Sequence, residues 1–171
     1  MTIVQDTREK TNKKEHILSW FKLKKINVVR SKMFVGDYTY LHNQTICVDS
    51  KFSLLEVAQN VTKDHERFKN ECIRARDNGI QLVILIECEE VDKLENLHKY
   101  KMPTYKSTGF KKVNGKSVMT HYKGQPMSRM NPETLQKALM TMQDKYGIKV
   151  MFAKRLKFGE MIIRILNREF E

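Results

Sequence analysis

Short apolar runs alternate with amphipathic stretches along the first third of the chain. Residues 2–6 alternate apolar and polar side chains and predict a strand. Residues 11–25 predict a helix, because their apolar side chains recur at helical spacing, at Ile17, Leu18, Phe21 and Leu23. Residues 27–35 are rich in β-branched and apolar side chains and predict a second strand.

The next segment, GDYTYLHNQTICVDSK at residues 36–51, predicts a tight hairpin. Ser53 and Glu56 have the spacing of a capping box, so a helix should begin there. A further helix is expected over residues 62–77, ending at Asn78 and Gly79. The run QLVILIE at residues 81–87 is continuously apolar between its first and last residues, which is typical of a central strand covered on both faces.

The composition changes at residues 96–132. This segment holds eight Lys or Arg, no Asp or Glu and all three prolines of the chain. Such a segment builds little core, so we expect an exposed basic insertion. Order is expected to return in a helix over residues 134–146, a strand over 148–153 and a helix over 158–166. We therefore predict one mixed α/β domain over residues 1–171, with a central sheet flanked by helices and a loop-rich insertion at 96–132.

Composition narrows the class of protein. With 171 residues, 40% of them hydrophobic and 9% aromatic, the chain can build one complete core, which excludes wholesale disorder. No apolar run approaches the roughly 20 residues of a membrane helix, and the N-terminal residues lack the apolar centre of a signal peptide. We expect a cytoplasmic protein without a membrane partner.

The charge balance indicates a polyanionic partner. Lys and Arg total 32 against 20 Asp and Glu, a formal net charge of +12. Nucleic acid is the first candidate. An anionic membrane surface is the second, but no terminal amphipathic helix supports it. The three cysteines are far apart and form no CxxC pair, so we interpret them as buried thiols.

The hairpin carries the candidate chemistry. If its turn centres on Asn43, Asp37 lies opposite Asp49, with Cβ atoms about 4.5–5.5 Å apart. Lys51 then projects from the same face as Asp49, because strand side chains alternate. The opposite face carries Tyr38, Tyr40, Ile46 and Val48, which suit burial against a helix.

Carboxylates that face each other repel unless a cation lies between them. Oxygen ligands of this kind suit Mg²⁺ or Mn²⁺, and Lys51 could orient a water molecule beside the ion. The alternative is that Asp37 belongs to a turn while Asp49 and Lys51 form a solvated edge. The acidic residues Asp6 and Glu9, at the end of the first strand, either contribute a ligand to the same site or belong to a charged loop.

These segments carry a family resemblance. In this order, IVQDTRE, VGDYTY, VDSK, HERFKNE and QLVILIE resemble the nuclease domain of the XPF family of structure-specific DNA endonucleases, a branch of the PD-(D/E)XK superfamily, over about residues 3–88. Residues 132–166 resemble the C-terminal part of short, stand-alone bacterial and phage nucleases. The resemblance implies a restriction-endonuclease-like core, a bacterial or phage-infected cell, and Mg²⁺- or Mn²⁺-dependent DNA cleavage that leaves a 5′ phosphate and a 3′ hydroxyl.

The resemblance also implies roles for individual residues. Asp37, Asp49 and Glu9 correspond to metal ligands, Lys51 to the catalytic lysine, and Asp6 to a carboxylate that borders the metal. Ser50 stands where the family has arginine. Leu55 stands where an acidic residue is usual, so that role is not transferred, and Glu56 is one position out of register.

Nucleic-acid contacts are expected in two places. Arg8 belongs to the first motif, and Arg67 lies on the helix that would border the cleft, although an ion pair between Arg67 and Glu71 would explain that spacing as well. Larger XPF proteins append helix-hairpin-helix modules, and we expect the basic insertion to take their place. The basic residues predicted to contact DNA there are Lys106, Lys111, Lys112, Lys116, Lys123 and Arg129. The alternative is a solvated loop that contacts nothing in particular.

The leading prediction is a metal-dependent endonuclease for branched DNA or single-strand/duplex junctions. One alternative is a nucleic-acid-binding module that has lost the reaction, since Ser50 and Leu55 depart from the family pattern. Another is an adaptor subunit of a nuclease or recombination complex. An exposed apolar face on the helix at 62–77 would favour that adaptor, or a homodimer. Charge alone does not separate DNA from RNA.

Overall fold

The computed structural model describes residues 1–8, 14–103, 107–122 and 130–169, and within 107–122 it describes the side chains of residues 112–118. A six-stranded mixed sheet forms the centre, in the order β2-β1-β3-β4-β5-β8. Its strands are β1 (Thr2–Asp6), β2 (Asn27–Ser31), β3 (Tyr38–Tyr40), β4 (Ile46–Lys51), β5 (Gln81–Glu87) and β8 (Lys149–Ala153).

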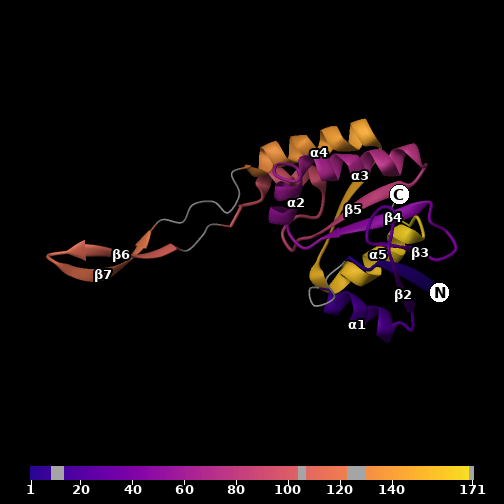
Figure 1. The fold of residues 1–171 in the computed structure, drawn as a ribbon, viewed down its shortest axis with the longest axis horizontal. Helices are drawn as coiled ribbons and strands as arrows, with labels where there is room; N and C mark the ends of the chain where they lie inside the picture. The colour runs from indigo at the N-terminus through magenta and orange to yellow at the C-terminus, as the bar shows by residue number, and fades with distance from the viewer. Residues whose placement is uncertain (9–13, 104–106, 123–129, 170–171) are drawn as a thin grey trace.

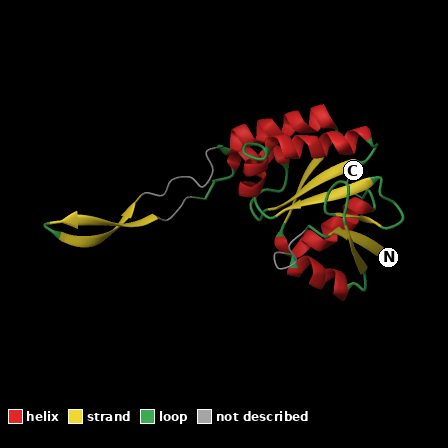
Figure 2. Cartoon of the chain, viewed as in Figure 1, coloured by secondary structure: helices red, strands yellow, loops and turns green. Residues whose placement is uncertain are grey.

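Helices cover both faces of this sheet, so the fold has three layers (Figures 1 and 2). The helices are α1 (Glu15–Leu23), α2 (Leu54–Asn60), α3 (His65–Asp77), α4 (Pro132–Tyr146) and α5 (Phe158–Leu166), with short 3₁₀ helices η2 (Leu94–Lys99) and η3 (Arg155–Lys157). On one face α2, α3 and α4 pack on the sheet, and on the other α1 and α5 do. The predicted mixed α/β architecture is confirmed.

Strand β5 shows how the two cores form. Ile84 and Ile86 pack into the core under α2, α3 and α4, whereas Val83 and Leu85 pack into the core under α1 and α5. All four side chains are fully buried. Successive side chains of β5 alternate between two buried cores rather than between core and solvent. The strand therefore needs a continuously apolar run.

The predicted hairpin register is also confirmed. Tyr38 pairs with Val48, and the amide of Asp37 donates a 2.8 Å hydrogen bond to the carbonyl of Val48. Tyr38, Ile46 and Val48 are buried under α1 and α5, as their alternation predicted. Gly36, in the loop just before β3, has a φ of 68°, in the left-handed region that favours glycine.

Helix boundaries follow the predicted signals with small shifts. The Ser53 hydroxyl accepts a hydrogen bond from the amide of Glu56, which caps α2. Helix α3 begins at His65 rather than Thr62, because residues 62–64 form turns that continue from α2. Strand β2 ends at Ser31, earlier than expected, and the following loop reaches Gly36. Helix α1 begins at Glu15, and residues 11–13 of the predicted helix lie outside the described residues.

The basic segment at 96–132 is not uniformly exposed. Leu97 is fully buried, and Tyr100, Met102 and Met130 pack against the core under α4, so the two ends of this segment contribute to the domain. Between those ends, β6 (Ser107–Val113) pairs with β7 (Lys116–Tyr122) in an antiparallel hairpin that lies apart from the central sheet (Figure 1). The division into domain and insertion remains a prediction.

Two further sequence expectations can be compared with the described residues. Cys47, Cys72 and Cys88 are free, buried thiols, and burial raises the pKa of Cys47 to about 11 and of Cys72 to about 12. Within the described ranges, no helix combines the length and the apolar character needed to cross a membrane.

Candidate active site

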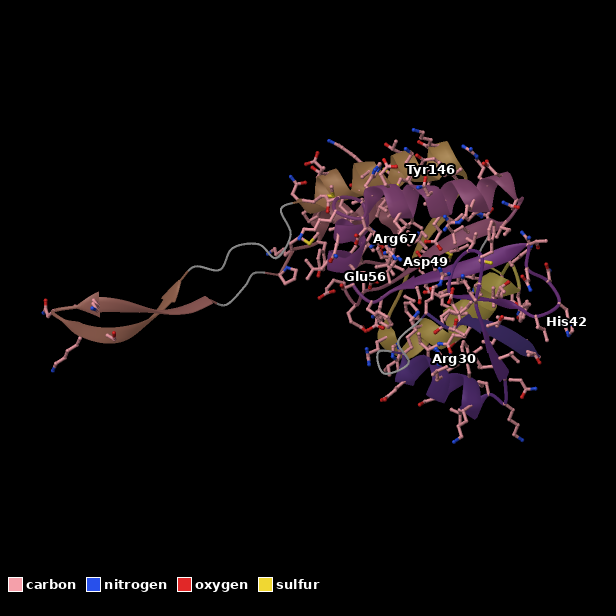
Figure 3. The ribbon with its side chains drawn as sticks, in the orientation of Figure 1. Arg30, His42, Asp49, Glu56, Arg67 and Tyr146 are labelled. Atoms are coloured by element: carbon pink, nitrogen blue, oxygen red, sulfur yellow. The ribbon has the colours of Figure 1, made fainter. Side chains whose placement is uncertain are left out.

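The predicted acidic residues meet at one edge of the sheet. Strands β1 and β4 both pair antiparallel with β3, so their carboxyl ends lie at the edge where β3 begins. This edge brings together Asp6 at the end of β1, Asp37 just before β3, and Asp49 and Lys51 at the end of β4. All four are buried. Figure 3 shows Asp49 below Arg67 of α3, with Glu56 of α2 to its left.

Asp37 is held by several donors. Its Oδ2 accepts hydrogen bonds from the amide of Ser50 at 2.8 Å, from the hydroxyl of Ser50 at 2.6 Å and from Nζ of Lys14 at 3.0 Å. Burial alone would raise the pKa of Asp37, but the ammonium groups of Lys14 and Lys51 and the two Ser50 hydrogen bonds hold it below its ordinary value. Asp37 is therefore a carboxylate with a fixed orientation.

Asp49 has a different environment. Lys51 Nζ donates a hydrogen bond to Oδ1 at 2.9 Å and forms an ion pair with Oδ2 at 2.7 Å, but the contact with Oδ2 lacks hydrogen-bond geometry. Burial, together with repulsion from Asp37 and Glu71, raises the pKa of Asp49 to about 7, despite the attraction of Lys51. Burial opposes the charge of Lys51, but the carboxylates of Asp49 and Asp37 outweigh it and raise the pKa of Lys51, so Lys51 keeps its positive charge.

Asp6 is engaged by Arg8. The amide of Arg8 donates to Asp6 Oδ1 at 2.8 Å, its Nε lies 3.0 Å from Oδ2, and its terminal nitrogen also pairs with Oδ2. Burial opposes ionisation of Asp6, but these Arg8 contacts outweigh it and lower the pKa. The side chain of Arg8 remains 58% exposed, so Arg8 both neutralises Asp6 and presents positive charge at the surface of the site.

Lys14 is a site residue that the sequence analysis missed. Its side chain is fully buried, with Nζ 2.6 Å from the hydroxyl of Ser50 as well as 3.0 Å from Asp37, and the ammonium lies over the rings of Tyr38 and Phe52. Lys14 occupies the N-cap position of α1, where a cation is unfavourable for the helix dipole. No local sequence signal pointed to Lys14, because the helix predicted over residues 11–25 places it inside the helix rather than at the cap.

The helices above this edge supply Glu71, Glu56 and Arg67. Glu71 on α3 accepts a 2.9 Å hydrogen bond from the amide of Gly36, which anchors the turn before Asp37. Glu56 on α2 accepts from the amide of Phe52 and contributes to the electrostatic field at Lys51. Arg67 is exposed, and the described residues contain no ion pair between Arg67 and Glu71, which leaves Arg67 available to a ligand.

The described residues fit a divalent cation in part. Asp49 Oδ2 is a buried oxygen that accepts no hydrogen bond, and the raised pKa of Asp49 reflects its burial and the negative charge of Asp37 and Glu71, which a cation would relieve. Oxygen donors suit Mg²⁺ or Mn²⁺. Among the described residues, no group of three or more His, Cys, Asp or Glu side chains is arranged to hold a metal ion. Glu9, the third ligand predicted from the sequence, lies outside the described residues.

The basic residues predicted to contact nucleic acid are described only in part. Lys112 and Lys116 are exposed on the β6–β7 hairpin. Lys106, Lys123 and Arg129 lie outside the described residues, as does the side chain of Lys111. A separate pocket of about 540 Å³ lies beside η2 and includes Glu90, Asn96 and Tyr100, but none of the candidate catalytic residues lines it.

A protein-family model for the ERCC4 domain matches residues 5–162. A comparison with curated protein sequences gives no significant match. The match covers more of the chain than residues 3–88, the region in which the main motif resemblance was seen.

Solved structures of similar fold include XPF from Aeropyrum pernix, with a TM-score of 0.62 and 17% identity, over 100% of this chain and 62% of that one. The same protein in a complex with DNA has a TM-score of 0.58 and 17% identity, over 98% of this chain and 64% of that one. This chain thus spans less than two thirds of each. The similarity confirms the predicted restriction-endonuclease-like core.

Proposed function

Because the chain belongs to the ERCC4 domain family of XPF nucleases, we propose that it is a metal-dependent, structure-specific DNA endonuclease. The observation that carries the proposal is the buried group of Asp37, Asp49 and Lys51 at one edge of the sheet, in a chain of net charge +12. A buried, ionised group of this kind has a cost in stability that a structural role does not require.

Asp37 and Asp49 would hold the divalent ion, with Glu9 as the further ligand expected from the sequence. When bound, Mg²⁺ or Mn²⁺ would polarise the scissile phosphate and lower the pKa of a water molecule. Ser50 and Lys14 keep the Asp37 carboxylate in one orientation through the contacts at Oδ2. Lys51, whose side chain is buried beside Asp49, orients the attacking water and stabilises the negative charge that develops on the phosphate.

Exposed cations would bind the DNA backbone around this site. Arg8 lies at the protein surface beside the buried Asp6, and Arg67 lies on α3. Lys112 and Lys116 lie on the β6–β7 hairpin. The neighbouring structure of XPF from Aeropyrum pernix in a complex with DNA supports a DNA ligand for this fold. We propose flap, fork or junction DNA as the substrate, and a homodimer as the assembly. Helix α3 gives that homodimer no support, since Phe68, Cys72 and Ala75 face the core.

DNA binding without hydrolysis is a second candidate function. The observation that favours it is the ammonium of Lys14, 3.0 Å from Asp37 Oδ2, because a bound ammonium competes with a metal ion for that carboxylate. In such a protein, Lys14 would replace the ion and leave a binding surface in the same fold.

Cleavage of a labelled DNA panel separates the two candidates. The panel contains single strands, duplex, 5′ and 3′ flaps and a four-way junction, each incubated with Mg²⁺, Mn²⁺ or EDTA. The proposal expects metal-dependent cutting that Asp37→Ala and Asp49→Ala abolish while DNA affinity is retained. Asp144→Ala, which removes an exposed carboxylate of α4, is the matched control and should cut normally.

Two outcomes would count against the proposal. Cutting that survives both Asp37→Ala and Asp49→Ala would show that the reaction takes place elsewhere. Salt-sensitive binding by the wild-type protein without cutting in either metal would establish the second candidate, and Ser50→Arg would then be the first variant to test for recovery of cleavage.

A further inference from the structure

An exposed aromatic side chain lies in the loop that leads to the site. Phe34 is 59% exposed, whereas its neighbours Met33 and Val35 are buried at 7% and 1% exposure. A large apolar side chain in water is ordinary when it stands alone on a surface. Phe34 differs, because the loop around it is fixed and it lies three residues before Asp37.

Two contacts hold this loop. Arg8 donates a 2.9 Å hydrogen bond to the carbonyl of Met33, and the amide of Gly36 donates a 2.9 Å hydrogen bond to Glu71. The side chains of Met33 and Val35 pack in the core under α3. The backbone on both sides of Phe34 is therefore tied to the domain, and Phe34 is held outward.

Helix α3 places positive charge beside the Phe34 ring. The guanidinium of Arg74 lies 5.9 Å from the ring centroid, within the range of a cation–π contact. Arg67, Glu71 and Arg74 are spaced by four and three residues, so they share one face of α3. Glu71 anchors the loop, and the two arginines on either side of it present cations along that face. Arg74 forms no ion pair among the described residues.

The distance to the carboxylates suits a nucleic-acid strand. Three residues of extended chain span at most about 11 Å, so Phe34 lies within that distance of Asp37 along the backbone. Stacked nucleotides advance about 3.4 Å each along one strand. Phe34 is thus within about three nucleotide steps of a phosphate bound at Asp37 and Asp49.

We propose that Phe34, supported by Arg74, stacks on an unpaired base next to the phosphate that the site binds. The inference rests on the proposed function and names the feature of the substrate that the protein selects. An aromatic ring beside cations recognises the flat face of any base together with its charged backbone, without reading its sequence. A base within a duplex is already stacked on both sides, so this contact favours the junction between paired and unpaired DNA.

Fluorescence of 2-aminopurine provides the test, because stacking on an aromatic ring quenches it. The probe is placed at each of the three nucleotides on the single-stranded side of a fork, and binding is measured in EDTA so that no strand is cut. Wild-type protein should quench the probe at one of these positions. Phe34→Ala should abolish the quenching and weaken binding to the fork about 10-fold, with affinity for blunt duplex unchanged. Phe34→Trp should retain both signals.

Leu23→Ala is the matched control. Leu23 is 76% exposed at the end of α1, near the opposite edge of the sheet, so its removal should change neither quenching nor affinity. Wild-type quenching that persists in Phe34→Ala would overturn the inference. A change of oligomeric state in Phe34→Ala with unchanged binding to the fork would also overturn it and assign Phe34 to a protein–protein contact.

The test separates this inference from the proposed function. Quenching that depends on Phe34, in a protein that cuts no DNA with either metal, would support the stacking contact and refute the endonuclease. Metal-dependent cutting without such quenching would support the endonuclease and refute the stacking contact. A wild-type protein that binds neither fork nor duplex would refute both.

Discussion

The ammonium of Lys14 lies 3.0 Å from Oδ2 of Asp37, with both side chains buried although they are 23 positions apart in the chain. The buried Ser50 hydroxyl joins the same group, 2.6 Å from Nζ of Lys14. This contact connects the start of α1 to the strand pair that carries the candidate metal ligands. Lys14 thus neutralises the Asp37 carboxylate, whereas Lys51 is the cation that pairs with Asp49.

Lys14→Met should destabilise the fold strongly, because it leaves the buried Asp37 carboxylate without its ammonium partner. Removal of one partner from a buried ion pair costs about 3–5 kcal/mol of unfolding free energy. Urea denaturation measures this loss. The double variant Lys14→Met/Asp37→Asn should recover part of it, since no unpaired charge remains. Losses that simply add in the double variant would show that the two side chains do not interact.

The raised pKa of Asp49 should make the stability of the fold depend on pH. The Asp49 pKa is raised to about 7 in the folded protein, chiefly by burial, against an ordinary value of 3.8. Between these values the folded state binds more protons than the unfolded state, so stability falls as pH rises from about 4 to about 7. Asp49→Asn removes this titration, and its melting temperature minus that of the wild type should increase from pH 5 to pH 8. A difference that stays constant over this range would contradict the raised pKa. Lys51 can still donate a hydrogen bond to the asparagine carbonyl, so the variant should fold.

Gly36 offers a test of the turn before Asp37. An added Cβ would lie 3.1 Å from Cβ of Cys47 and 3.1 Å from the carbonyl oxygen of Val48, and the φ of 68° is unfavourable for alanine. Gly79→Ala is the matched control, because Gly79 has a φ of 64° and its added Cβ would meet nothing within 4 Å. Thermal melting should show a loss of about 1 kcal/mol for Gly79→Ala and a clearly larger loss for Gly36→Ala. Equal losses would show that the packing around Gly36 adapts without cost.

Lys112 and Lys116 test the basic hairpin as a DNA-binding element. If each lysine contacts one phosphate, Lys112→Gln/Lys116→Gln should reduce the slope of log affinity against log salt by about 2 for duplex DNA. Filter binding from low to moderate salt measures this slope. The double variant Lys22→Gln/Lys25→Gln, which removes two exposed lysines near the end of α1, should leave it unchanged. An unaltered slope in the hairpin variant would mean that these two lysines do not contact the backbone.

Much of this protein was predictable because the decisive signals are local. Strand alternation over residues 36–51 set the register in which Tyr38 pairs with Val48, and so placed Asp37, Asp49 and Lys51 at one edge. The Ser53 cap, the Asn78 and Gly79 signal at the end of α3 and the apolar run of β5 each depend on neighbouring residues or on a short hydrophobic period. Family motifs in the same segments indicated the fold, which the structural comparisons confirm.

The tertiary structure decided which distant side chains complete the site. Lys14 reaches Asp37, Glu71 anchors Gly36, and Arg8 holds the loop at Met33, through contacts that span 23, 35 and 25 residues. No local period encodes such contacts, because they depend on how α1, α3 and the β2–β3 loop pack on the sheet. The same packing leaves Phe34 outward between two buried neighbours. By itself the sequence determined the strands and the carboxylates at their ends, whereas long-range packing decided their charge partners and the surface that a substrate would meet.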